Sequence, residues 1–366
     1  MVFMRIAMIG HKRIPGREGG VEVVVEELSI RMAALGNDVT VYNRRAKGVK
    51  QATEYKGVKL VTVPTIESKS LDAVVYAFIA SIRALSGKYD VIHYHAIGPS
   101  FFLIIPHVFG IRTIVTVHGL NYKTPKWKGL GAIFMRLGEY VTAKYADEVI
   151  VLSHEQQRYF EEKYNRKTCY IPNGVTLRSI LSPDIIERKY ALKKNGYVLF
   201  LSRVVPGKGL EYLIQAYKET KTDLPLIIAG DAPFVSDFVD SIKNEAKDDA
   251  RIRFIGFVDG KELQELYSNA KVFVFPSEAE GMPLCLLEAL SYNAQCLVSD
   301  IPENTEVGKE YVMTFETKNV CDLRDKLKVA LSETDNDKVN SRGYIEKNYN
   351  WDEVVKKTLL LYKTEV

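Results

Sequence analysis

Two glutamates beside a turn carry the clearest chemical signal in the sequence. Glu280 and Glu288 lie eight residues apart in the segment PSEAEGMPLCLLEAL. A Gly-Met-Pro turn lies between them, and a helix should begin near Leu284. A carboxylate accepts hydrogen bonds from sugar hydroxyls, and the unpaired N–H groups of a helix N-terminus attract phosphate. The spacing therefore favours a site that holds a sugar and a phosphate together.

A pair of cations follows another expected strand. Arg203 and Lys208 lie in the segment RVVPGKG, directly after an apolar run that begins at Tyr197. Open parallel sheets bind ligands at the carboxyl ends of their strands. There, a guanidinium and an ammonium would suit a diphosphate. Solvated loop cations would give the same pattern, and the residues alone leave both interpretations open.

Glycines precede the first expected helix. Gly19 and Gly20 stand before a helix that begins near Val21, and adjacent glycines let a ligand approach the backbone closely. A tight strand-to-helix turn explains the same residues. The sequence contains neither GxGxxG nor GxxxxGK[ST], so the dinucleotide and P-loop fingerprints are missing.

Histidines end two strands of the first half. His93 and His95 are alternate residues at the end of one strand and therefore share a face. No third ligand is close in sequence, so a structural or acceptor-side role is favoured over zinc. His118 alone is an ordinary strand-end histidine. The D-x-D motif at 335–337 is typical of a solvated loop, and we expect no bound metal.

The elements that position these residues alternate along the chain. Short apolar runs separated by amphipathic stretches predict βαβ units and parallel sheets covered on both faces. The pattern restarts at Tyr197, so we expect two α/β domains divided within the polar stretch Asn173–Asn195. The expected strands are Arg5–Ile9, Asp38–Tyr42, Lys59–Val63, Val91–Tyr94, Thr113–Val117, Glu148–Leu152, Tyr197–Ser202, Leu226–Ala229, Ile252–Ile255, Val272–Phe275 and Ala294–Val298, and the expected helices are Val23–Leu35, Leu210–Tyr217, Lys261–Tyr267, Leu284–Leu290 and Tyr344–Tyr362.

Composition excludes several classes of protein. A length of 366 residues fits about two domains. With 46% hydrophobic and 26% charged residues, the chain is neither disordered nor a disulfide scaffold. A net charge of +4 disfavours a nucleic-acid binder. The first 180 residues hold 25 basic and 15 acidic residues, whereas the remainder holds 25 basic and 31 acidic residues. The basic excess of the first half suits an anionic partner, and a chance excess of solvated lysines is the alternative.

Membrane and secretion signals are weak. The uncharged stretch 91–111 has no apolar run near the ~20 residues that a membrane span requires. The N-terminal segment MVFMRIAMIG is expected to be a first strand instead of a signal peptide. The four cysteines form no CxxC pair and are expected to be buried thiols in a reducing compartment.

A basic and aromatic cluster follows His118. Lys123, Lys126, Trp127 and Lys128 are expected to meet a membrane surface or a lipid-linked diphosphate acceptor, with a plain surface loop as the alternative.

Taken together, these motifs resemble those of family 4 of the retaining glycosyltransferases, which have the GT-B fold of two Rossmann-like domains facing a central cleft. The resemblance covers nearly the whole chain. It rests on GGVE at 19–22, TVHGLNYKTPKW at 116–127, KYADEVIVLS at 144–153, YIPNGV at 170–175, SRVVPGKG at 202–209, FIGFV at 254–258 and EAEGMPLCLLEAL at 278–290. The family often has Asp after NGV, where this chain has Thr176.

The resemblance implies roles for individual residues. Arg203 and Lys208 would neutralise the donor diphosphate, Glu280 would bind the donor sugar and Glu288 the ribose. His118 would lie beside the reacting sugar and Gly20 beside the diphosphate. The remaining implied donor-binding residues are Phe257, Val258, Gly281, Met282, Pro283 and Leu284, and the implied acceptor-side residues are His95, Asn121, Lys123, Lys126, Trp127 and Lys128.

The resulting hypothesis is a metal-independent hexosyltransferase without a cofactor. It would move a sugar from a UDP-, dTDP- or GDP-sugar to a glycan or polyprenyl-diphosphate-linked acceptor. The expected division is an acceptor-side domain at 1–180, a nucleotide-sugar domain at 181–345, and a helix at 346–366 that crosses back to the first domain. The GGVE-type N-terminus resembles a branch that includes bacterial rhamnosyltransferases and related polysaccharide transferases, which implies a role in surface polysaccharide synthesis. The expected location is the cytoplasm, with peripheral association on the inner face of the cell membrane. A 2-epimerase of UDP-N-acetylhexosamine and an inactive sugar-nucleotide-binding or glycan-binding protein are the alternatives.

Overall fold

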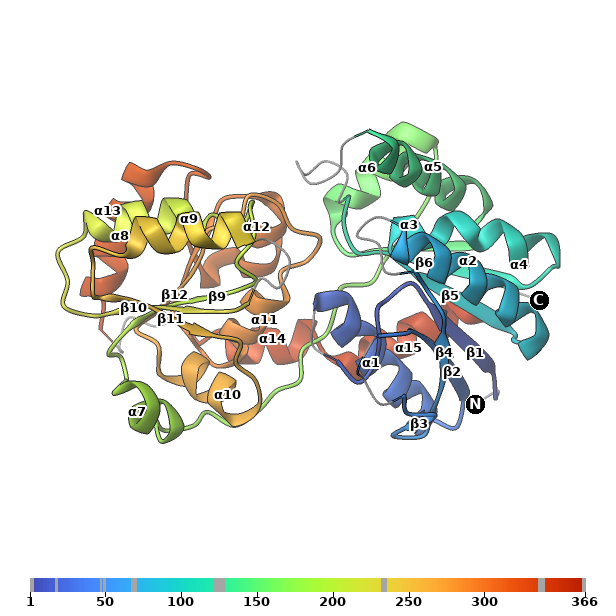
Figure 1. Ribbon diagram of the computed structural model, residues 1–366, viewed down its shortest axis with the longest axis horizontal. Helices are drawn as coiled ribbons and strands as arrows, with labels where there is room; N and C mark the ends of the chain where they lie inside the picture. The colour runs from blue at the N-terminus through green and yellow to red at the C-terminus, as the bar shows by residue number, and fades with distance from the viewer. Residues whose placement is uncertain are drawn as a thin grey trace. The chain divides into compact units, whose positions relative to one another are not determined.

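The computed structural model describes residues 3–16, 19–46, 48, 51–66, 71–120, 129–231, 236–334 and 340–363. It contains two compact units, which are shown in Figure 1. The first unit comprises Met1–Gly174 and Trp351–Val366, and the second comprises Val175–Asn350. Each unit is a sheet of mainly parallel strands with helices on both faces, so the predicted α/β class is confirmed.

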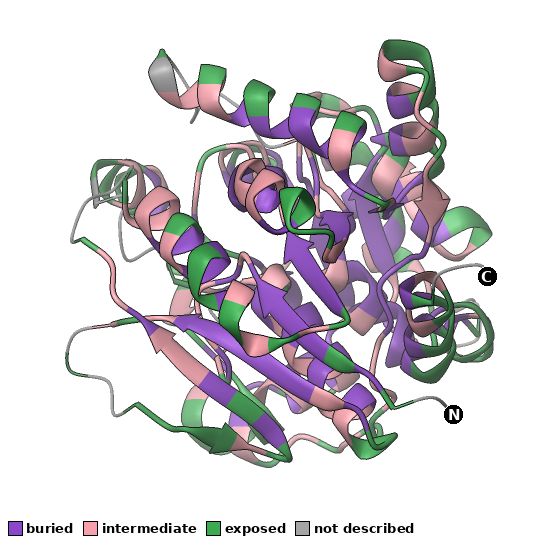
Figure 2. Cartoon of the chain, turned by 90° about the vertical axis from the view of Figure 1, so that its right-hand side faces the viewer, coloured by how far each residue is buried: buried purple, intermediate pink, exposed green. Residues whose placement is uncertain are grey.

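The sheet of the first unit has the strand order β3-β4-β2-β1-β5-β6-β7-β8 in the described residues. The pairs are parallel except β3 with β4. Its strands are β1 Arg5–Ile9, β2 Asp38–Arg44, β3 Glu54–Tyr55, β4 Val58–Val63, β5 Val91–His95, β6 Arg112–Val117, β7 Glu148–Val151 and β8 Cys169–Tyr170. Figure 2 shows that the central strands are buried along their length, as sheets covered on both faces require.

Helices cover this sheet because one stripe of each is apolar. On one face, Tyr76 and Ala80 of α2, Ile97 of α3 and Val141 of α5 enter the core with strand residues. On the other, α1 lies beside α15. The helices of the unit are α1 Gly20–Ala34, α2 Asp72–Ala84, η1 Leu85–Gly87, α3 Ile97–Ser100, η2 Phe101–Leu103, α4 Ile104–Val108, α5 Leu130–Tyr145, α6 His154–Tyr164 and α15 Trp351–Tyr362.

The sheet of the second unit is parallel throughout and has the order β11-β10-β9-β12-β13-β14. Helices α8, α9 and α13 pack on one face through Leu213, Ile242 and Leu327. The strands are β9 Val198–Leu201, β10 Leu226–Ala229, β11 Ile252–Gly256, β12 Val272–Phe275, β13 Cys296–Ser299 and β14 Met313–Phe315, and the helices are α7 Ile185–Tyr190, α8 Leu210–Lys218, α9 Ser236–Ala246, α10 Gly260–Asn269, α11 Leu284–Ser291, α12 Pro302–Gly308, η4 Lys309–Tyr311, α13 Val320–Ser332 and α14 Arg342–Asn348.

Three sequence expectations need correction. The single helix expected over Tyr344–Tyr362 is two helices, α14 and α15, because the backbone leaves the helical region at Tyr349. The short strands β3, β8 and β14 were not expected, since two or three residues carry no readable periodicity. Of the four cysteines that were expected to be buried, Cys296 is buried, Cys169 and Cys285 are partly exposed and Cys321 is exposed.

The boundary between the units lies between Gly174 and Val175, with the chain re-entering the first unit at Trp351. The stretch 91–111 forms β5, α3, η2 and α4 of the first unit. In the part of the chain that the structure describes, no helix combines the length and the apolar character needed to span a bilayer.

Candidate active site

The carboxyl ends of β9 and β12 bring most of the predicted donor-binding residues of the second unit together. Arg203 stands two residues beyond the end of β9 and is exposed. Its side chain has no ion pair or hydrogen bond within the described ranges. The guanidinium is therefore available to a ligand.

Lys208 and Glu280 form a direct ion pair between Nζ and Oε1. Both side chains are largely buried, with 16% and 12% of their surface exposed. Ser277 Oγ donates a second hydrogen bond to Glu280 Oε1 at 2.5 Å. The sequence assigned these two residues separate roles, whereas the structure shows them as one unit. A cation and the carboxylate predicted to bind the sugar are thus oriented before any ligand arrives.

Backbone contacts hold the two loops that carry this pair. The N–H of Glu278 donates to the carbonyl of Gly207 at 2.9 Å. Gly209 adopts φ 68°, and a Cβ at this position would lie 2.0 Å from the carbonyl oxygen of Pro276. Because only glycine tolerates this backbone and this approach, Gly209 fixes the loop that presents Lys208.

Helix α11 presents an uncapped N-terminus at the same edge. Pro283 is its N-cap, with no side-chain hydrogen bond, and the N–H groups of Leu286 and Leu287 both donate to the Pro283 carbonyl. The N–H groups of the first turn have no partner within the helix and suit an anion. Glu288 lies one turn further on, where Tyr267 Oη donates to its Oε2 at 3.3 Å. Burial, with the Glu288 carboxylate nearby, raises the pKa of Cys285 to about 12, so this thiol stays protonated.

The two residues predicted to bind the base differ in exposure. They follow β11, whose last residue is Gly256. Phe257 is 56% exposed, whereas Val258 is buried. Phe257 can offer a ring for stacking, but Val258 can meet a ligand only through its backbone.

In the first unit, His93, His95 and His118 form a continuous row at the ends of β5 and β6. The rings of His93 and His95 lie 4.2 Å apart on one face, as alternation along the strand predicted. His95 Nδ1 and His118 Nε2 share a hydrogen bond at 3.0 Å. His93 Nδ1 and Nε2 contact Tyr362 Oη at 2.6 Å and Thr116 Oγ1 at 2.7 Å, which gives His93 a structural role.

Burial keeps these imidazoles neutral. Desolvation lowers the pKa of His93 to about 3 and that of His118 to about 4. It also lowers the pKa of His95 well below its ordinary value. The buried Nε2 of His95 has no hydrogen-bond partner in the described structure. A neutral His118 can accept or donate one hydrogen bond, but it carries no charge at pH 7.

Two further residues at this edge were missed from the sequence. His11 follows β1, and its Nε2 contacts Asn43 Oδ1 at 3.0 Å. Burial lowers the pKa of His11 to about 4. Gly10 adopts φ 119°, and a Cβ there would lie 2.1 Å from the carbonyl oxygen of His95, so the strand ends meet closely. Their position directly after a buried strand was the signal that could have identified them.

Helix α1 begins at Gly20, one residue before the predicted start near Val21, and Gly19 is its N-cap in an extended backbone. Glu22 Oε1 accepts from the N–H of Lys12 at 3.0 Å and ties the preceding loop to the helix. The first N–H groups of α1 are therefore another position that suits an anion.

Several predicted residues lie outside the described residues. These are Asn121, Lys123, Lys126, Trp127 and Lys128, together with the D-x-D motif at 335–337. Among the residues that are described, no cluster of three or more His, Cys, Asp or Glu side chains could hold a metal ion. The acceptor-side cluster stays a prediction.

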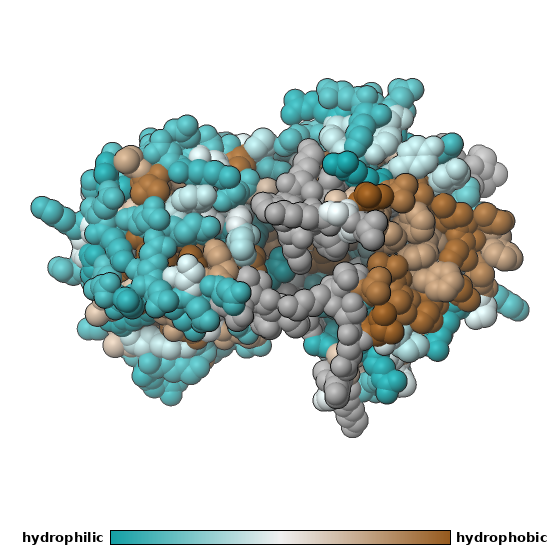
Figure 3. Space-filling model, turned by 45° about the horizontal axis from the view of Figure 1, so that its top comes forward, coloured by the Kyte–Doolittle hydropathy of each residue, from teal (hydrophilic) through white to brown (hydrophobic). Residues whose placement is uncertain are grey.

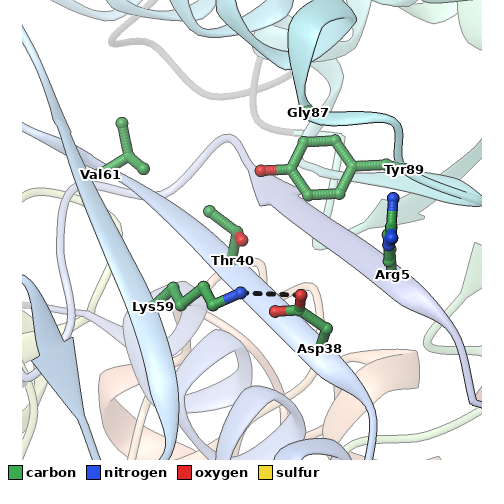
Figure 4. A pocket seen from close by; sticks show the side chains of 7 residues that line it. All are labelled: Arg5, Asp38, Thr40, Lys59, Val61, Gly87 and Tyr89. Atoms are coloured by element: carbon green, nitrogen blue, oxygen red, sulfur yellow. Dashed lines mark hydrogen bonds and ion pairs between the residues drawn. The ribbon is translucent and has the colours of Figure 1, made fainter.

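A pocket of about 320 Å³ lies at the opposite, amino edge of the first sheet (Figure 4). Lys59 pairs with Asp38 at 2.7 Å within it. None of the predicted site residues lines this pocket, whose lining comprises Arg5, Asp38, Thr40, Lys59, Val61, Gly87 and Tyr89. Ligands of parallel sheets bind at the other edge, so the pocket is no candidate active site.

Comparison with known families identifies the chain. Residues 18–179 match the model described as Glycosyltransferase Family 4, and residues 183–348 match that described as Glycosyl transferases group 1. The chain belongs to glycosyltransferase family 4. Each matched segment corresponds to one structural unit, so the two units are the two halves of a family 4 glycosyltransferase.

Curated relatives of this glycosyltransferase include two enzymes of Escherichia coli. O-antigen chain mannosyltransferase B is 24% identical over 357 residues, which cover 87% of this chain and 92% of the relative. UDP-Gal:alpha-D-GlcNAc-diphosphoundecaprenol alpha-1,3-galactosyltransferase is 30% identical over 232 residues, 59% of each chain.

Solved structures show the same fold. Sucrose-phosphate synthase from Thermosynechococcus elongatus superimposes with a TM-score of 0.82 at 19% identity, covering 98% of both chains. Anabaena HepE, solved in complex with UDP and glucose, superimposes with a TM-score of 0.80 at 15% identity, again over 98% of both chains. The fold of this family 4 glycosyltransferase is GT-B, as predicted.

Proposed function

We propose that this glycosyltransferase moves a sugar from a UDP-, dTDP- or GDP-sugar to a glycan or lipid-linked acceptor, with retention at the anomeric carbon. The observation that carries the proposal is the strand-end cluster of the second unit. It combines Arg203, whose side chain has no partner among the described residues, with the Lys208–Glu280 ion pair and the N-terminus of α11. This set matches the charges and hydroxyls of a nucleotide sugar.

The cations would act where negative charge develops. Cleavage of the sugar–phosphate bond leaves an additional negative charge on the departing nucleoside diphosphate. Arg203, the Lys208 ammonium and the first N–H groups of α11 would stabilise that charge. Because these groups supply the positive charge, we propose that transfer requires no metal ion.

Glu280 would hold the sugar while Lys208 holds the diphosphate. Its Oε1 is occupied by Lys208 and Ser277, so Oε2 would accept from a hydroxyl of the donor sugar. Glu288 would accept from the ribose hydroxyls, and Phe257 would stack on the base. A short, fixed link between the sugar-binding and phosphate-binding groups would keep the scissile bond in a constant position.

The first unit would contribute His118 and Gly20. A neutral His118, held by His95, would hydrogen-bond a hydroxyl near the reacting carbon without adding charge to an oxocarbenium-like transition state. Gly20 would let the diphosphate approach the N-terminus of α1.

The acceptor proposal rests on relatives. One curated relative is named as a transferase to a diphosphoundecaprenol-linked sugar, and another as an O-antigen mannosyltransferase. We therefore propose a polyprenyl-diphosphate-linked or glycan acceptor in bacterial surface polysaccharide synthesis, with the enzyme on the cytoplasmic face of the membrane.

The decisive experiment is a donor panel in which release of UDP, dTDP or GDP is measured with and without a polyprenyl-diphosphate-linked sugar. Arg203→Ala should lower turnover of the active donor by about 100-fold, whereas Arg188→Ala, on the exposed α7, should leave it unchanged. Turnover should persist in EDTA, and the product should keep the anomeric configuration of the donor.

Three results would overturn the proposal. Conversion of a UDP-N-acetylhexosamine without any acceptor would indicate an epimerase. Tight nucleotide-sugar binding with no product from any donor would indicate a binding protein. Equal turnover by Arg203→Ala and the wild type would contradict the assignment of the donor site to this cluster.

A further inference from the structure

Exposed apolar side chains gather on one side of the first unit. Figure 3 shows them as a hydrophobic patch. Val108 and Phe109, at the end of α4, are 74% and 69% exposed. The other large exposed members come from α2 and α5, and they are Phe78, Ile82, Ile133, Leu137 and Tyr140. We call this set the apolar face.

Ring contacts show that the apolar face is continuous across three elements. Phe78 of α2 lies 5.6 Å from Phe102 of η2, and Phe102 lies 6.2 Å from Phe134 of α5. Phe101 contacts Phe102 and Phe134, each at 5.2 Å. Residues 97–111 form α3, η2 and α4 between β5 and β6, and they contain no Asp, Glu, Lys or Arg.

The helices beneath this face are apolar on two sides. In α5, Met135 and Val141 are buried toward the sheet, while Ile133, Leu137 and Tyr140 point outward at helical spacing. A helix that is apolar on both sides normally has a partner on both sides. Scattered exposed apolar residues are ordinary, but a continuous patch marks an interaction surface.

The charges around the apolar face indicate an anionic partner. Each exposed charged side chain within the described α2, α4 and α5 is basic, namely Arg83, Arg136 and Lys144. The acidic residues of these helices are neutralised elsewhere, because Asp72 is only partly exposed and pairs with Arg44, and Glu139 is buried beside Lys163. Lys144 Nζ lies 5.6 Å and 5.5 Å from the ring centroids of Tyr140 and Tyr145.

We propose that the apolar face docks the protein on an anionic phospholipid bilayer. The aliphatic and phenylalanine side chains enter the boundary between headgroups and acyl chains, and the tyrosines and basic residues remain at the headgroup level. Apolar burial and attraction to anionic lipid then add, which gives reversible binding without a membrane span. The apolar face includes none of the residues of the predicted cluster at 123–128, and docking does not depend on sugar transfer.

Vesicle flotation of the full chain tests the proposal. The vesicles consist of phosphatidylcholine with or without roughly one-third phosphatidylglycerol. The wild type should float with the anionic vesicles at low salt and less at high salt. The double variant Val108→Ser/Phe109→Ser should bind at least about tenfold more weakly. Lys144→Glu should lower binding chiefly at low salt.

Matched controls separate docking from folding and catalysis. Leu360→Ser on α15 and Val329→Ser on α13 remove comparably exposed side chains outside the apolar face and should float like the wild type. Release of nucleotide from a donor with a water-soluble acceptor should be unchanged in the double variant. Loss of nucleotide release in the double variant would contradict a purely docking role for the apolar face, whatever the outcome of the donor panel.

Other outcomes would overturn the proposal. The proposal fails if the wild type does not float with anionic vesicles at low salt. It also fails if the double variant floats as well as the wild type. Concentration-dependent dimerisation that Phe109→Ser abolishes, without vesicle binding, would assign the face to a second copy of the chain instead.

Discussion

The buried histidine row makes the first unit sensitive to acid in a way that can be calculated. His93 is fully buried, and its pKa is lowered to about 3, against about 6.5 in an unfolded chain. As the pH falls through about 6.5, the His93 imidazole becomes protonated in the unfolded state but stays neutral in the folded state. Stability attributable to His93 is therefore complete above that pH and is lost as the pH falls toward 3.

The magnitude follows from the size of the gap. Each pKa unit corresponds to about 1.4 kcal/mol, so the interval from 6.5 to about pH 5 costs about 2 kcal/mol for this one histidine. His93→Gln removes the titrating ring. The variant should be less stable than the wild type at pH 7, but its loss of stability between pH 7 and pH 5 should be smaller by about 2 kcal/mol.

Tryptophan fluorescence during urea unfolding is a suitable assay. The sequence contains two tryptophans, Trp127 and Trp351, and both fall within the first unit. Free energies of unfolding are measured at several pH values for the wild type, His93→Gln and His154→Gln. His154 is exposed, and His154→Gln controls for the histidine-to-glutamine substitution itself.

Parallel pH profiles for the wild type and His93→Gln would refute the reasoning. They would mean that the folded protein admits a proton at His93, or that the row rearranges on acidification. A steeper profile for His93→Gln would also contradict the assigned sign.

Three further perturbations have definite expected results. Gly209→Ala places a Cβ 2.0 Å from the Pro276 carbonyl oxygen at φ 68° and should lower the free energy of unfolding by about 3 kcal/mol. Gly207→Ala, with open space at φ 84°, should lower it by about 1 kcal/mol. Calorimetric unfolding measures both values, and equal losses would contradict the loop geometry. Glu280→Gln keeps the side-chain shape but removes the charge that orients its lysine, so turnover should fall about 100-fold, and an unchanged rate would exclude a role for the ion pair. Tyr362→Phe loses one hydrogen bond to the buried row and should lower stability by about 1 kcal/mol in urea unfolding, where an unshifted midpoint would count against that bond.

Much of the fold was predictable because periodicity reports burial. Strands β1, β10 and β12 have the predicted bounds, since each is a mainly apolar run followed by a glycine or a proline. The break between α14 and α15 was not predictable, because apolar spacing continues across Tyr349 and only tertiary structure separates the two helices.

The residues of the candidate site could be predicted from the sequence, but the contacts between them could not. Residue type and position after a strand were enough to select Arg203, Lys208 and Glu280. The ion pair of Lys208 with Glu280 joins two loops more than sixty residues apart, and no local pattern encodes it. The partnership of His93 with Tyr362 was missed for the same reason, whereas His11 had a local signal in its position after β1.

The return of α15 to the first unit has a consequence for synthesis of the protein. Residues Val175–Asn350 are continuous and can fold as soon as they leave the ribosome, whereas the first unit waits for the last residues of the chain. Until then, His93 lacks Tyr362, and Arg112 lacks the carbonyl of Leu361 that it contacts at 2.9 Å. The second unit is thus complete before the first, and a chain that terminates before Trp351 leaves an unfinished first unit for the cell's proteases.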